Sequence, residues 1–526
     1  MVQKGAFKVK KRVVLVVADG WGIAPAGPGN YIDMARTPNF DGFLKKYPHC
    51  INLASGTAVG LPPGSQGNSE VGHLHMGAGR IVWQMYQLIN NAIDDKGFFK
   101  NKALVSAIDH AKKNNSKLHI MGMCSDEGVH SHVNHLFALL MMAKEHGLTE
   151  VYVHFFADGR DVPEKSAKKY VKMVEDEIRR IGVGRIASIV GRYYSMDRDT
   201  NWDRTRKAYD MLTKAEGFRA KSAQDAVEMA YERGDKTDYY IQPTVIVDDS
   251  DEAIATVDDG DSVIFFNFRI DRTRQLTKAF VFDEFDYFKR DVRPNVLFTT
   301  MSKYDKNIEC LVAYTEETVE NNLGKMLSGC GLLQLRMAET EKYAHVTYYF
   351  NSMVEKPNAG EERLMIPSSK VSSYDQKPQM SAYEIADEAA RQISKKKYDF
   401  VLVNFANCDL VGHSAVKEAI IRCVEVVDEC CAKIASAGLN NDYVVIITAD
   451  HGSAEDKLYP DGVLKPAHSS NPVPFILVST DENLMKVTLL DGGQKDVAPT
   501  ILDIMGMKKP KEMTGKSLII GKQNTI

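Results

Sequence analysis

The sequence has no stretch that would span a membrane and no cysteine pattern that would build a fold around disulfides or zinc. Its longest apolar runs, such as Val13–Ala18, are far shorter than the roughly 20 residues of a membrane-spanning helix. Eight cysteines are scattered along the chain without a CxxC pair. This pattern is typical of unpaired thiols in a reducing compartment. We therefore expect a cytoplasmic protein without a membrane partner.

Targeting signals and an excess of one charge are also lacking. Met1–Lys4 contains no signal-peptide stretch, and Gln523–Ile526 is neither a peroxisomal nor a retention signal. The net charge is only −4, and no long run of one sign stands out. Because nucleic-acid surfaces are usually strongly basic, we expect no nucleic-acid partner.

What the sequence does have is length and a globular composition. Its 526 residues exceed one ordinary core, and about 100–200 residues per domain predict two or three domains. Hydrophobic residues make up 44% of the chain, which is the share of a folded globular protein.

Short β-branched runs near both ends of the chain are followed by polar, often acidic, residues. These runs are Val13–Ala18, Phe400–Phe405 and Tyr443–Thr448. Continuous apolar runs indicate parallel strands that are buried on both faces of a sheet. Helical patterns alternate with them, over Ala382–Lys395 and Val416–Ala435. The alternation predicts an α/β fold, whose ligands bind at the carboxyl ends of the strands.

The middle of the chain contains a second group of strand-like runs, each leading into a charged loop. They are Leu118–Met123, Val151–Phe156, Arg185–Val190 and Ser262–Phe266. Helix-like stretches accompany them, over Ala167–Ile181 and Arg204–Leu212. The pattern predicts a second α/β domain. Because site-like loops occur at both ends of the chain, we expect this domain to be inserted into the first.

Potential metal ligands follow the three strands of the first group. They are Asp19, Asp409, the pair Asp450-His451, His413 four residues after Asp409, and His468 in a later turn-rich loop. Carboxylates with imidazoles suit Mn²⁺ or Zn²⁺ better than Ca²⁺. Six such groups suit two ions, and a two-metal centre can hold both oxygens of a phosphoryl displacement. The alternative is that the acids are helix caps or turn residues.

A loop rich in glycine and proline, Leu61–His73, contains a candidate nucleophile, Ser69. A helix is expected over Val71–Met76, so backbone N–H groups would point at a phosphate bound beside Ser69. A serine hydroxyl is a weak nucleophile unless a base or a metal activates it. Two alternatives stay open: Ser69 only caps the helix, or Ser65 is the nucleophile.

Arginines gather in three loops of the middle segment, at the predicted strand ends. The loops are Asp158–Pro163, Gly191–Asp199 and Asn267–Arg274. Arginine matches carboxylate and phosphate oxygens in bidentate geometry, so the loops predict a pocket for a small polyanion. The alternative is that arginine–aspartate pairs only hold the loops.

The histidines of Ser125–His135 have the spacing H-x-H-x-x-H. This spacing is not a standard zinc signature. One histidine that binds substrate, with the others structural, is an equally good interpretation.

Taken together, these segments resemble the cofactor-independent phosphoglycerate mutases over nearly the whole chain. Several long motifs occur in the family's order. They are Asp19–Gly22, Gly67–His73, His130–His132, Gly159–Asp161, Ala338–Thr347 and Thr448–Gly452.

The resemblance implies an alkaline-phosphatase-like α/β sandwich domain with a second α/β transferase domain inserted. The expected bounds are 1–84 and 318–526 for the metal-binding, phosphatase-like domain and 85–317 for the substrate-binding transferase domain. It also implies an isomerase of glycolysis and gluconeogenesis that interconverts 3-phosphoglycerate and 2-phosphoglycerate without bisphosphoglycerate. Two divalent ions are implied, Mn²⁺ first with Mg²⁺ or Co²⁺ as alternatives. We expect a monomer whose partner is the small-molecule phosphoglycerate.

The resemblance also implies roles for individual residues. One metal would be held by Asp409, His413 and His468, and the other by Asp19, Ser69, Asp450 and His451. Ser69 would become phosphoserine, and Asp161 would handle the hydroxyl protons of the glycerate. Substrate would be held by His130, Arg160, Asp161, Arg192, Arg198, Arg269, Arg272 and Lys342.

The chain departs from the usual family pattern at several loops. Pro63–Gln66 replaces the common approach to the serine, and Glu127 stands where glycine is frequent. Asn351–Met353 replaces Asn-Gly-Gly, Cys408 replaces a proline, and Ser453 replaces an asparagine. None of these changes removes an expected ligand.

Two other functions stay open from the sequence. A metallophosphatase or a phosphosugar mutase would use the same metal domain, although the arginine loops and Lys342 argue against it. A non-enzymatic protein that binds RNA through the arginine loops is the second, and metal-dependent turnover would exclude it.

Overall fold

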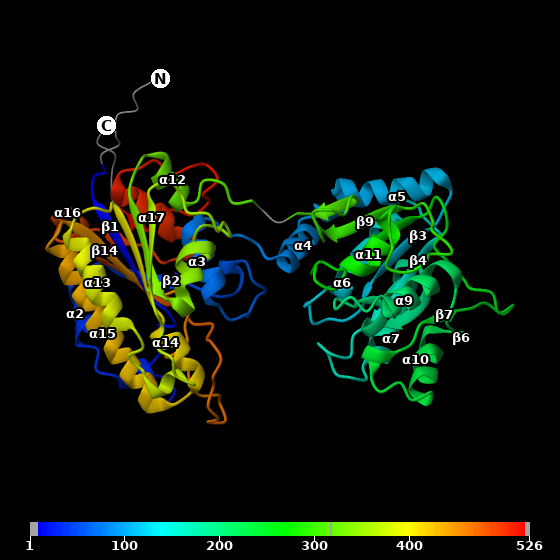
Figure 1. The fold of residues 1–526 in the computed structure, drawn as a ribbon, viewed down its shortest axis with the longest axis horizontal. Helices are drawn as coiled ribbons and strands as arrows, with labels where there is room; N and C mark the ends of the chain where they lie inside the picture. The colour runs from blue at the N-terminus through cyan, green and yellow to red at the C-terminus, as the bar shows by residue number, and fades with distance from the viewer. Residues whose placement is uncertain (1–8, 316–317, 521–526) are drawn as a thin grey trace, which may run out of the picture. The chain divides into compact units, whose positions relative to one another are not determined.

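The chain folds into two compact units in a computed structural model that describes residues 9–315 and 318–520 (Figure 1). Unit 1 comprises Met1–Trp83 and Glu317–Ile526, and unit 2 comprises Gln84–Glu316. The two ends of the chain therefore build one unit and the middle builds the other.

Unit 1 contains an eight-stranded sheet in the order β12-β11-β13-β1-β14-β15-β2-β17. The strands are β1 (Arg12–Ala18), β2 (His49–Leu53), β11 (Gln334–Glu339), β12 (Glu361–Ile366), β13 (Phe400–Phe405), β14 (Tyr443–Thr448), β15 (Val473–Val478) and β17 (Gly492–Gly493). Strands β12 to β14 run parallel, whereas β15 is antiparallel to both of its neighbours. Two further short strands, β16 (Thr488–Leu489) and β18 (Ile519–Ile520), pair with each other.

The central strand β1 explains why this sheet is covered on both faces. Val14 and Val16 lie in a core with the helices α2 (Pro38–Lys46), α13 (Ala382–Ser394) and α15 (Lys417–Leu439). Val13 and Leu15 lie in another core, with α3 (Ser69–Ala78), α12 (Leu323–Gly329) and α17 (Val497–Met505). Successive side chains of a strand point to opposite faces, so an all-apolar strand requires helices on both sides.

The helices of unit 1 begin and end as follows. They are α1 (Tyr31–Met34), α2 (Pro38–Lys46), α3 (Ser69–Ala78), α12 (Leu323–Gly329), α13 (Ala382–Ser394), α14 (Asn407–Leu410), α15 (Lys417–Leu439), α16 (Glu482–Met485) and α17 (Val497–Met505). The expected helices over Ala382–Lys395 and Val416–Ala435 correspond to α13 and α15.

Unit 2 contains its own eight-stranded sheet in the order β10-β9-β8-β3-β4-β5-β7-β6. The strands are β3 (Leu118–Met123), β4 (Val151–Ala157), β5 (Arg185–Gly191), β6 (Phe218–Ala220), β7 (Thr244–Ile246), β8 (Ser262–Phe265), β9 (Leu297–Ser302) and β10 (Leu311–Tyr314). The neighbours β8, β3, β4 and β5 are parallel, so their carboxyl ends meet at one edge.

Helices cover both faces of this second sheet as well. They are α4 (Met85–Asp94), α5 (Lys102–Asn114), α6 (Val133–Glu145), α7 (Ala167–Ile181), α8 (Arg192–Ser195), α9 (Trp202–Lys214), α10 (Ala223–Glu232) and α11 (Arg274–Val281). One core gathers residues of α5, α6, α7 and α10, and the other gathers residues of α9 and α11. The predicted α/β fold class is confirmed. Among the described residues, no helix combines the length and the apolar character that a membrane crossing requires.

Candidate metal centre and anion-binding cluster

Three carboxylates of unit 1 meet because their strands are neighbours. Strand β1 pairs in parallel with β13 on one side and with β14 on the other. Asp19 follows β1 directly, Asp409 lies in α14 just after β13, and Asp450 follows β14 after one residue. The parallel register thus brings three acids to one edge, where all three side chains are buried.

Asp409 meets two histidines from different loops. Its Oδ1 lies 3.3 Å from Nε2 of His413 and 2.9 Å from Nε2 of His468. The two Nε2 atoms are 3.2 Å apart. The Nδ1 atoms are occupied elsewhere, by the carbonyl of Pro466 for His413 and of Gly67 for His468. A ring that donates through Nδ1 presents a lone pair at Nε2, so both histidines are oriented to bind a cation.

His451 joins the acids of the neighbouring group. Its Nε2 lies 3.4 Å from Oδ1 of Asp19, 3.8 Å from Oδ2 of Asp450 and 3.9 Å from Oδ1 of Asp409. The His451 side chain has no exposed surface. Asp450 is itself fixed, because its Oδ1 accepts hydrogen bonds from the backbone N–H groups of Gly20 and His451.

The concentration of acids shifts the proton equilibria of this site. Burial opposes ionisation of Asp450, but the neighbouring His451 and His73 hold its pKa well below the ordinary range. Burial by itself would lower the pKa of His451, yet the carboxylates around it, Asp450 first, raise that pKa to about 10. Without a metal, His451 therefore stays protonated, and its positive charge offsets the negative charge of the carboxylates around it.

Ser69 points its hydroxyl into this cluster. It is the first residue of α3, but the cap is Asn68, whose Oδ1 accepts the N–H of Val71. The hydroxyl of Ser69 lies 3.3 Å from Oδ1 of Asp19 and 3.1 Å from Nε2 of His451. The interpretation of Ser69 as a simple helix cap is therefore wrong.

Ser65, the rival serine, takes part in the loop through its backbone. Its N–H donates to the carbonyl of Pro62, and its carbonyl accepts from Gly56. Among the described residues, its hydroxyl makes no hydrogen bond to the acids or histidines of the cluster.

Lys342 supplies the one ammonium, within the described part of the chain, that reaches the serine. It ends a short turn, Thr340–Lys342, that follows β11. Its Nζ lies 2.5 Å from Oγ of Ser69, 2.8 Å from Oδ1 of Asp19 and 2.6 Å from Oδ2 of Asp409. Burial lowers the pKa of this lysine, but the adjacent carboxylates of Asp19 and Asp409 raise it above its ordinary value. The lysine stays charged at any physiological pH.

The donor set of this cluster fits two divalent cations. Three overlapping groups each bring three ligand atoms within 4.8 Å of one another: Asp409, His413 and His468; Asp19, Asp409 and His451; and Asp19, His73 and Asp450. Among the described residues, Oδ1 of Asp409 and Oδ2 of Asp450 are buried and accept no well-aligned hydrogen bond. Buried carboxylate oxygens that accept no hydrogen bond are costly unless the charge of a nearby cation offsets theirs.

Two further side chains of the cluster were not predicted as ligands. Nδ1 of His73 lies 3.3 Å from Oδ2 of Asp450, and its Nε2 lies 3.1 Å from the amide of Asn404. That amide also donates to Oδ2 of Asp19, at 2.8 Å. The spacing of four residues from Ser69 to His73 on one helix face was a usable signal. Asn404 gave none, because it stands inside an apolar strand.

Unit 2 gathers its arginines at the carboxyl edge of its own sheet. The loops that follow β3, β4, β5 and β8 all contribute. Arg192 is buried, and its guanidinium donates to Asp158 and to Asp161, each at 2.6 Å. It also lies 2.8 Å from Nε2 of His130. These contacts bring three predicted residues, His130, Asp161 and Arg192, into one cluster.

The other predicted arginines extend this cluster. Asp271 accepts from Arg198 at 2.7 Å and lies 3.2 Å from Nε of Arg269. Arg272 is buried and donates to the carbonyl of Met196. Burial and the neighbouring cations Arg192, Arg198 and Arg160 lower the pKa of Arg272. Arg160 itself is exposed. Arginines that repel one another in this way favour an anion between them.

Within the H-x-H-x-x-H segment, only the first histidine faces this cluster. Burial and the charge of Arg192 lower the pKa of His130 to about 4, so it is neutral at physiological pH. His132 caps α6 by accepting the N–H of Asn134, and His135 is buried against Asn90. The latter two are structural, and the three do not form a metal site among the described residues.

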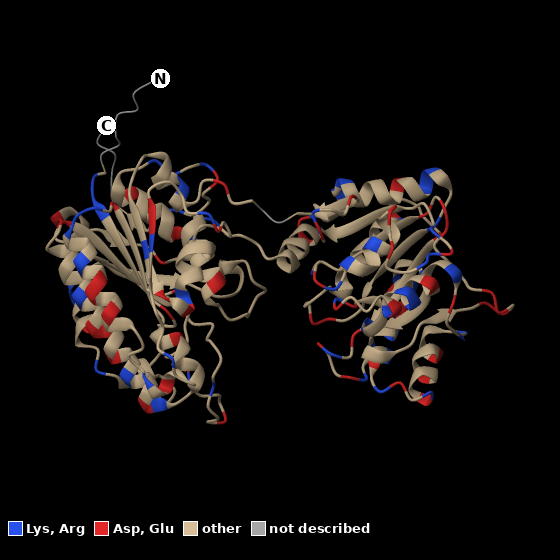
Figure 2. Ribbon diagram, viewed as in Figure 1, with Lys and Arg blue, Asp and Glu red and all other residues tan. Residues whose placement is uncertain are grey.

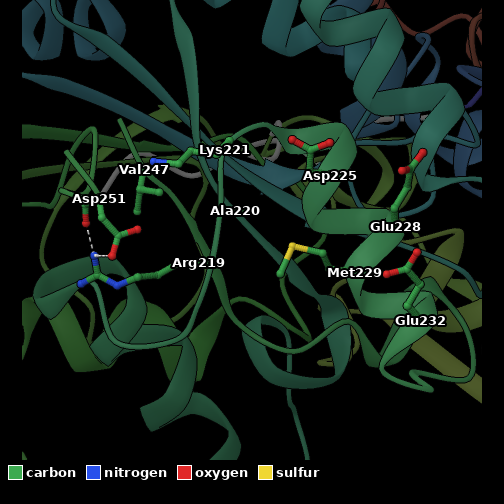
Figure 3. A pocket seen from close by; sticks show the side chains of 9 residues that line it. All are labelled: Arg219, Ala220, Lys221, Asp225, Glu228, Met229, Glu232, Val247 and Asp251. Atoms are coloured by element: carbon green, nitrogen blue, oxygen red, sulfur yellow. Dashed lines mark hydrogen bonds and ion pairs between the residues drawn. The ribbon is translucent and has the colours of Figure 1, made fainter. Parts of the chain in front are cut away.

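A cavity of about 340 Å³ lies elsewhere in unit 2, between β6 and α10 (Figure 3). There Arg219 forms an ion pair with Asp251, and acidic side chains of α10 line the other side. None of the predicted site residues lines this cavity. Lysine and arginine positions are interspersed with aspartate and glutamate positions along the ribbons of both units (Figure 2).

One departure from the family pattern has a visible structural consequence. Ser352 and Met353 have φ angles of 60° and 63°, in the left-handed region that favours glycine. These positions follow Asn351, where the family commonly has two glycines. The two side chains therefore strain a turn in unit 1 that glycine would adopt freely.

Comparisons with known protein families agree with this division of the chain. A family model described as the BPG-independent PGAM N-terminus matches residues 89–306. A second, described as type I phosphodiesterase / nucleotide pyrophosphatase, matches residues 332–467. The second match lies within unit 1 and agrees with the expected alkaline-phosphatase-like fold.

Relatives and one solved structure match almost the full chain. A 2,3-bisphosphoglycerate-independent phosphoglycerate mutase of Moorella thermoacetica is 51% identical over 516 residues, covering 98% of this chain and 99% of the relative. One of Clostridium perfringens is 50% identical over 513 residues, covering 97% and 99%. The crystal structure of Leishmania mexicana phosphoglycerate mutase at low cobalt concentration is 30% identical, with a TM-score of 0.57 and 97% and 98% coverage.

Proposed function

Because the chain belongs to the 2,3-bisphosphoglycerate-independent phosphoglycerate mutases, which interconvert 3-phosphoglycerate and 2-phosphoglycerate, we propose that Ser69 carries the phosphoryl group between the two positions. The observation that carries this proposal is the setting of its hydroxyl. It lies within hydrogen-bond distance of Asp19, His451 and Lys342 at once. No other serine of the described residues has such neighbours.

The cluster of unit 1 has the donors for two divalent ions, for which we propose Mn²⁺, with Mg²⁺ or Co²⁺ as alternatives. Asp409, His413 and His468 would hold one ion, and Asp19, Ser69, Asp450 and His451 the other. Bound there, the ions would favour the ionised serine hydroxyl and offset charge on the phosphoryl oxygens. No bisphosphoglycerate takes part in the proposed cycle.

The first half of the proposed cycle transfers the phosphoryl group to the enzyme. Oγ of Ser69, whose proton has passed to solvent in the ionised state, attacks phosphorus in line, an Oγ–P bond forms, and the bond from phosphorus to the glycerate oxygen breaks. Lys342 offsets the charge that the phosphoryl oxygens develop, because its ammonium is already fixed beside Oγ. Asp161 donates a proton to the departing glycerate oxygen.

The second half reverses these steps at the other hydroxyl. Asp161 takes the proton of the incoming glycerate hydroxyl, which attacks phosphoserine and releases Ser69. We propose that the arginine cluster, His130 included, binds the phosphoglycerate before transfer and holds the glycerate by its carboxylate while the phosphoryl group is on Ser69. In this scheme unit 1 is the metal-binding, phosphatase-like domain and unit 2 the substrate-binding transferase domain.

Two matched serine variants test the nucleophile. Ser69→Ala is expected to reduce kcat by about 10⁴-fold or more, as removal of a nucleophile does in other enzymes. Ser65→Ala, in the same loop, is expected to keep kcat within about twofold because a surface change is small in effect. A coupled assay without bisphosphoglycerate measures both. Near-normal turnover by Ser69→Ala would refute the assignment.

We also propose a cytoplasmic location. All eight cysteines are free, which suits a reducing compartment. The expected monomeric state stays a prediction, and sedimentation of the purified chain would measure its mass directly.

A further inference from the structure

Lys457 is a lysine of unit 1 that no step of the proposed cycle uses. Its side chain has no exposed surface. Among residues 9–315 and 318–520, no carboxylate lies within ion-pair distance of its ammonium. Burial of a lysine without a paired acid is costly, so its remaining contacts need an explanation.

The ammonium of Lys457 donates to three loops at once. Its Nζ lies 3.2 Å from the carbonyl of Gly412, 3.2 Å from the carbonyl of Ala467 and 3.0 Å from Oγ of Ser453. An ammonium has three N–H donors, so these acceptors account for all of them. Its backbone is anchored as well, through hydrogen bonds with Gly29 and Lys465.

Two of these acceptors directly precede the histidines of the cluster. Gly412 comes before His413, and Ala467 comes before His468. The two histidines are 55 residues apart in the chain, yet their Nε2 atoms lie 3.2 Å apart. Each lies in a turn or loop rather than in a strand. The side chain of Lys457 therefore links the two backbone segments that carry His413 and His468.

The loops around this ammonium leave little room to move. A Cβ added at Gly412 would lie 2.7 Å from Oγ of Ser453 and 3.5 Å from Nζ of Lys457. Asp409, by contrast, stands in α14 directly after the buried strand β13, so its place does not depend on these loops.

We propose that Lys457 is a positioning residue that pre-organises His413 and His468 for their cation by cross-linking the two loops. The inference rests on the proposed function, because it takes the histidines as metal ligands. Residues that orient metal ligands typically affect affinity by about 10–100-fold. The other half of the cluster, Asp19, Asp450 and His451, has no contact with this ammonium among the described residues.

The test is Mn²⁺ titration of the metal-free full-length chain by calorimetry. Lys457→Met keeps the length of the apolar stem but removes the ammonium with all three donors. It is expected to weaken one of two Mn²⁺ affinities by at least about tenfold. Lys457→Gln can satisfy fewer acceptors and is expected to fall between Met and wild type. His413→Ala identifies which affinity belongs to the histidine pair.

Lys465→Met is the matched control. The substitution removes a neighbouring ammonium, which pairs with Asp456 at 2.5 Å. Within the described residues, this ammonium donates to neither the carbonyl of Gly412 nor that of Ala467. Both Mn²⁺ affinities are expected to stay within about twofold of wild type, since a partly exposed ion pair contributes little. Saturating Mn²⁺ should restore kcat of Lys457→Met with an unchanged KM for phosphoglycerate, whereas a general loss of structure would not be restored.

The outcomes separate this inference from the proposed function. Wild-type affinities in Lys457→Met would overturn the inference alone, provided that His413→Ala loses one site. Equal weakening of both sites, together with a lower thermal midpoint of the metal-free chain, would also overturn it and leave a structural role. If His413→Ala binds two ions as the wild type does, the metal assignment and the inference both fall.

Discussion

The two clusters occupy the same place in two sheets yet have opposite character. Each lies at the carboxyl ends of neighbouring parallel strands. In unit 1 the strands deliver buried carboxylates, and these raise the pKa of His451 to about 10. In unit 2 the loops deliver arginines, and burial with Arg192 lowers the pKa of His130 to about 4. The strand edge only gathers side chains; their charge decides whether the cluster suits a cation or an anion.

The largest expected difference between the clusters comes from the same substitution in each. Asp409→Asn removes a carboxylate that faces two histidines and Lys342, so kcat should fall by about 10³-fold or more, equivalent to several kcal/mol of lost charge stabilisation. Asp271→Asn in unit 2 removes a carboxylate that pairs with Arg198 and Arg269 and lies 3.6 Å from Nδ1 of His130, and kcat should fall by about tenfold or less. Steady-state assays at saturating Mn²⁺ compare them. Equal losses would abolish the distinction between the clusters.

The positions of the three acids show how much of the site follows from the sequence. Asp19, Asp409 and Asp450 each follow an apolar run, so the pattern of parallel strands alone predicts that they meet at one edge. Lys342 stands in a turn, and only the family resemblance indicated it. Lys457, between Asp456 and Leu458, resembles an ordinary surface lysine in the sequence, yet it is fully buried. Contacts between loops distant in the chain leave no periodic signal, which is why the sequence pattern by itself indicates neither lysine.

The next-largest expected difference between the two units is the effect of acid on their stability. Nε2 of His154 lies 2.9 Å from Nδ1 of His119 within the sheet of unit 2, and burial lowers the pKa of both. Unfolded histidines titrate near about 6.5. Their contribution to stability is complete above that pH and declines below it, by about 1.4 kcal/mol per pH unit for each histidine that stays neutral.

His451 responds in the opposite direction in the metal-free chain. Its pKa is raised to about 10, so its contribution is complete below about 6.5 and is lost as pH rises through about 10. Hydrogen exchange of the metal-free chain at pH 7 and pH 5 reports on each strand. We expect β3 and β4 to lose more protection at pH 5 than β1 and β14. The reverse order would show that burial does not control these histidines.

A smaller effect tests whether the arginine cluster serves binding rather than stability. Arg198 is half-exposed and contacts Asp271, so Arg198→Ala should raise KM for phosphoglycerate by about tenfold, or about 1.4 kcal/mol, with little change in thermal midpoint. Arg206→Ala removes a comparable ion pair with Asp210 on α9, away from the cluster. An equal rise in KM for both variants would point to a general charge effect.

The smallest expected effect concerns unit 1 away from its cluster. Met353→Gly should stabilise the chain by about 0.5–1 kcal/mol, because glycine relieves a left-handed residue at a modest entropic cost. Met353→Ala keeps the Cβ and should give no such gain. Denaturant unfolding measures both. Equal changes in the two variants would show that the side chain, not the backbone, is responsible.

The role of Ser69 as phosphoryl carrier is tested most directly by locating the phosphate on the enzyme during turnover. The Mn²⁺-loaded enzyme is mixed with excess 3-phosphoglycerate, quenched in acid within one turnover, digested and sequenced by mass spectrometry. We predict phosphate on Ser69, lost in Ser69→Ala and retained in Ser65→Ala. Turnover with phosphate on a different residue, or on none at every quench time, would contradict the account.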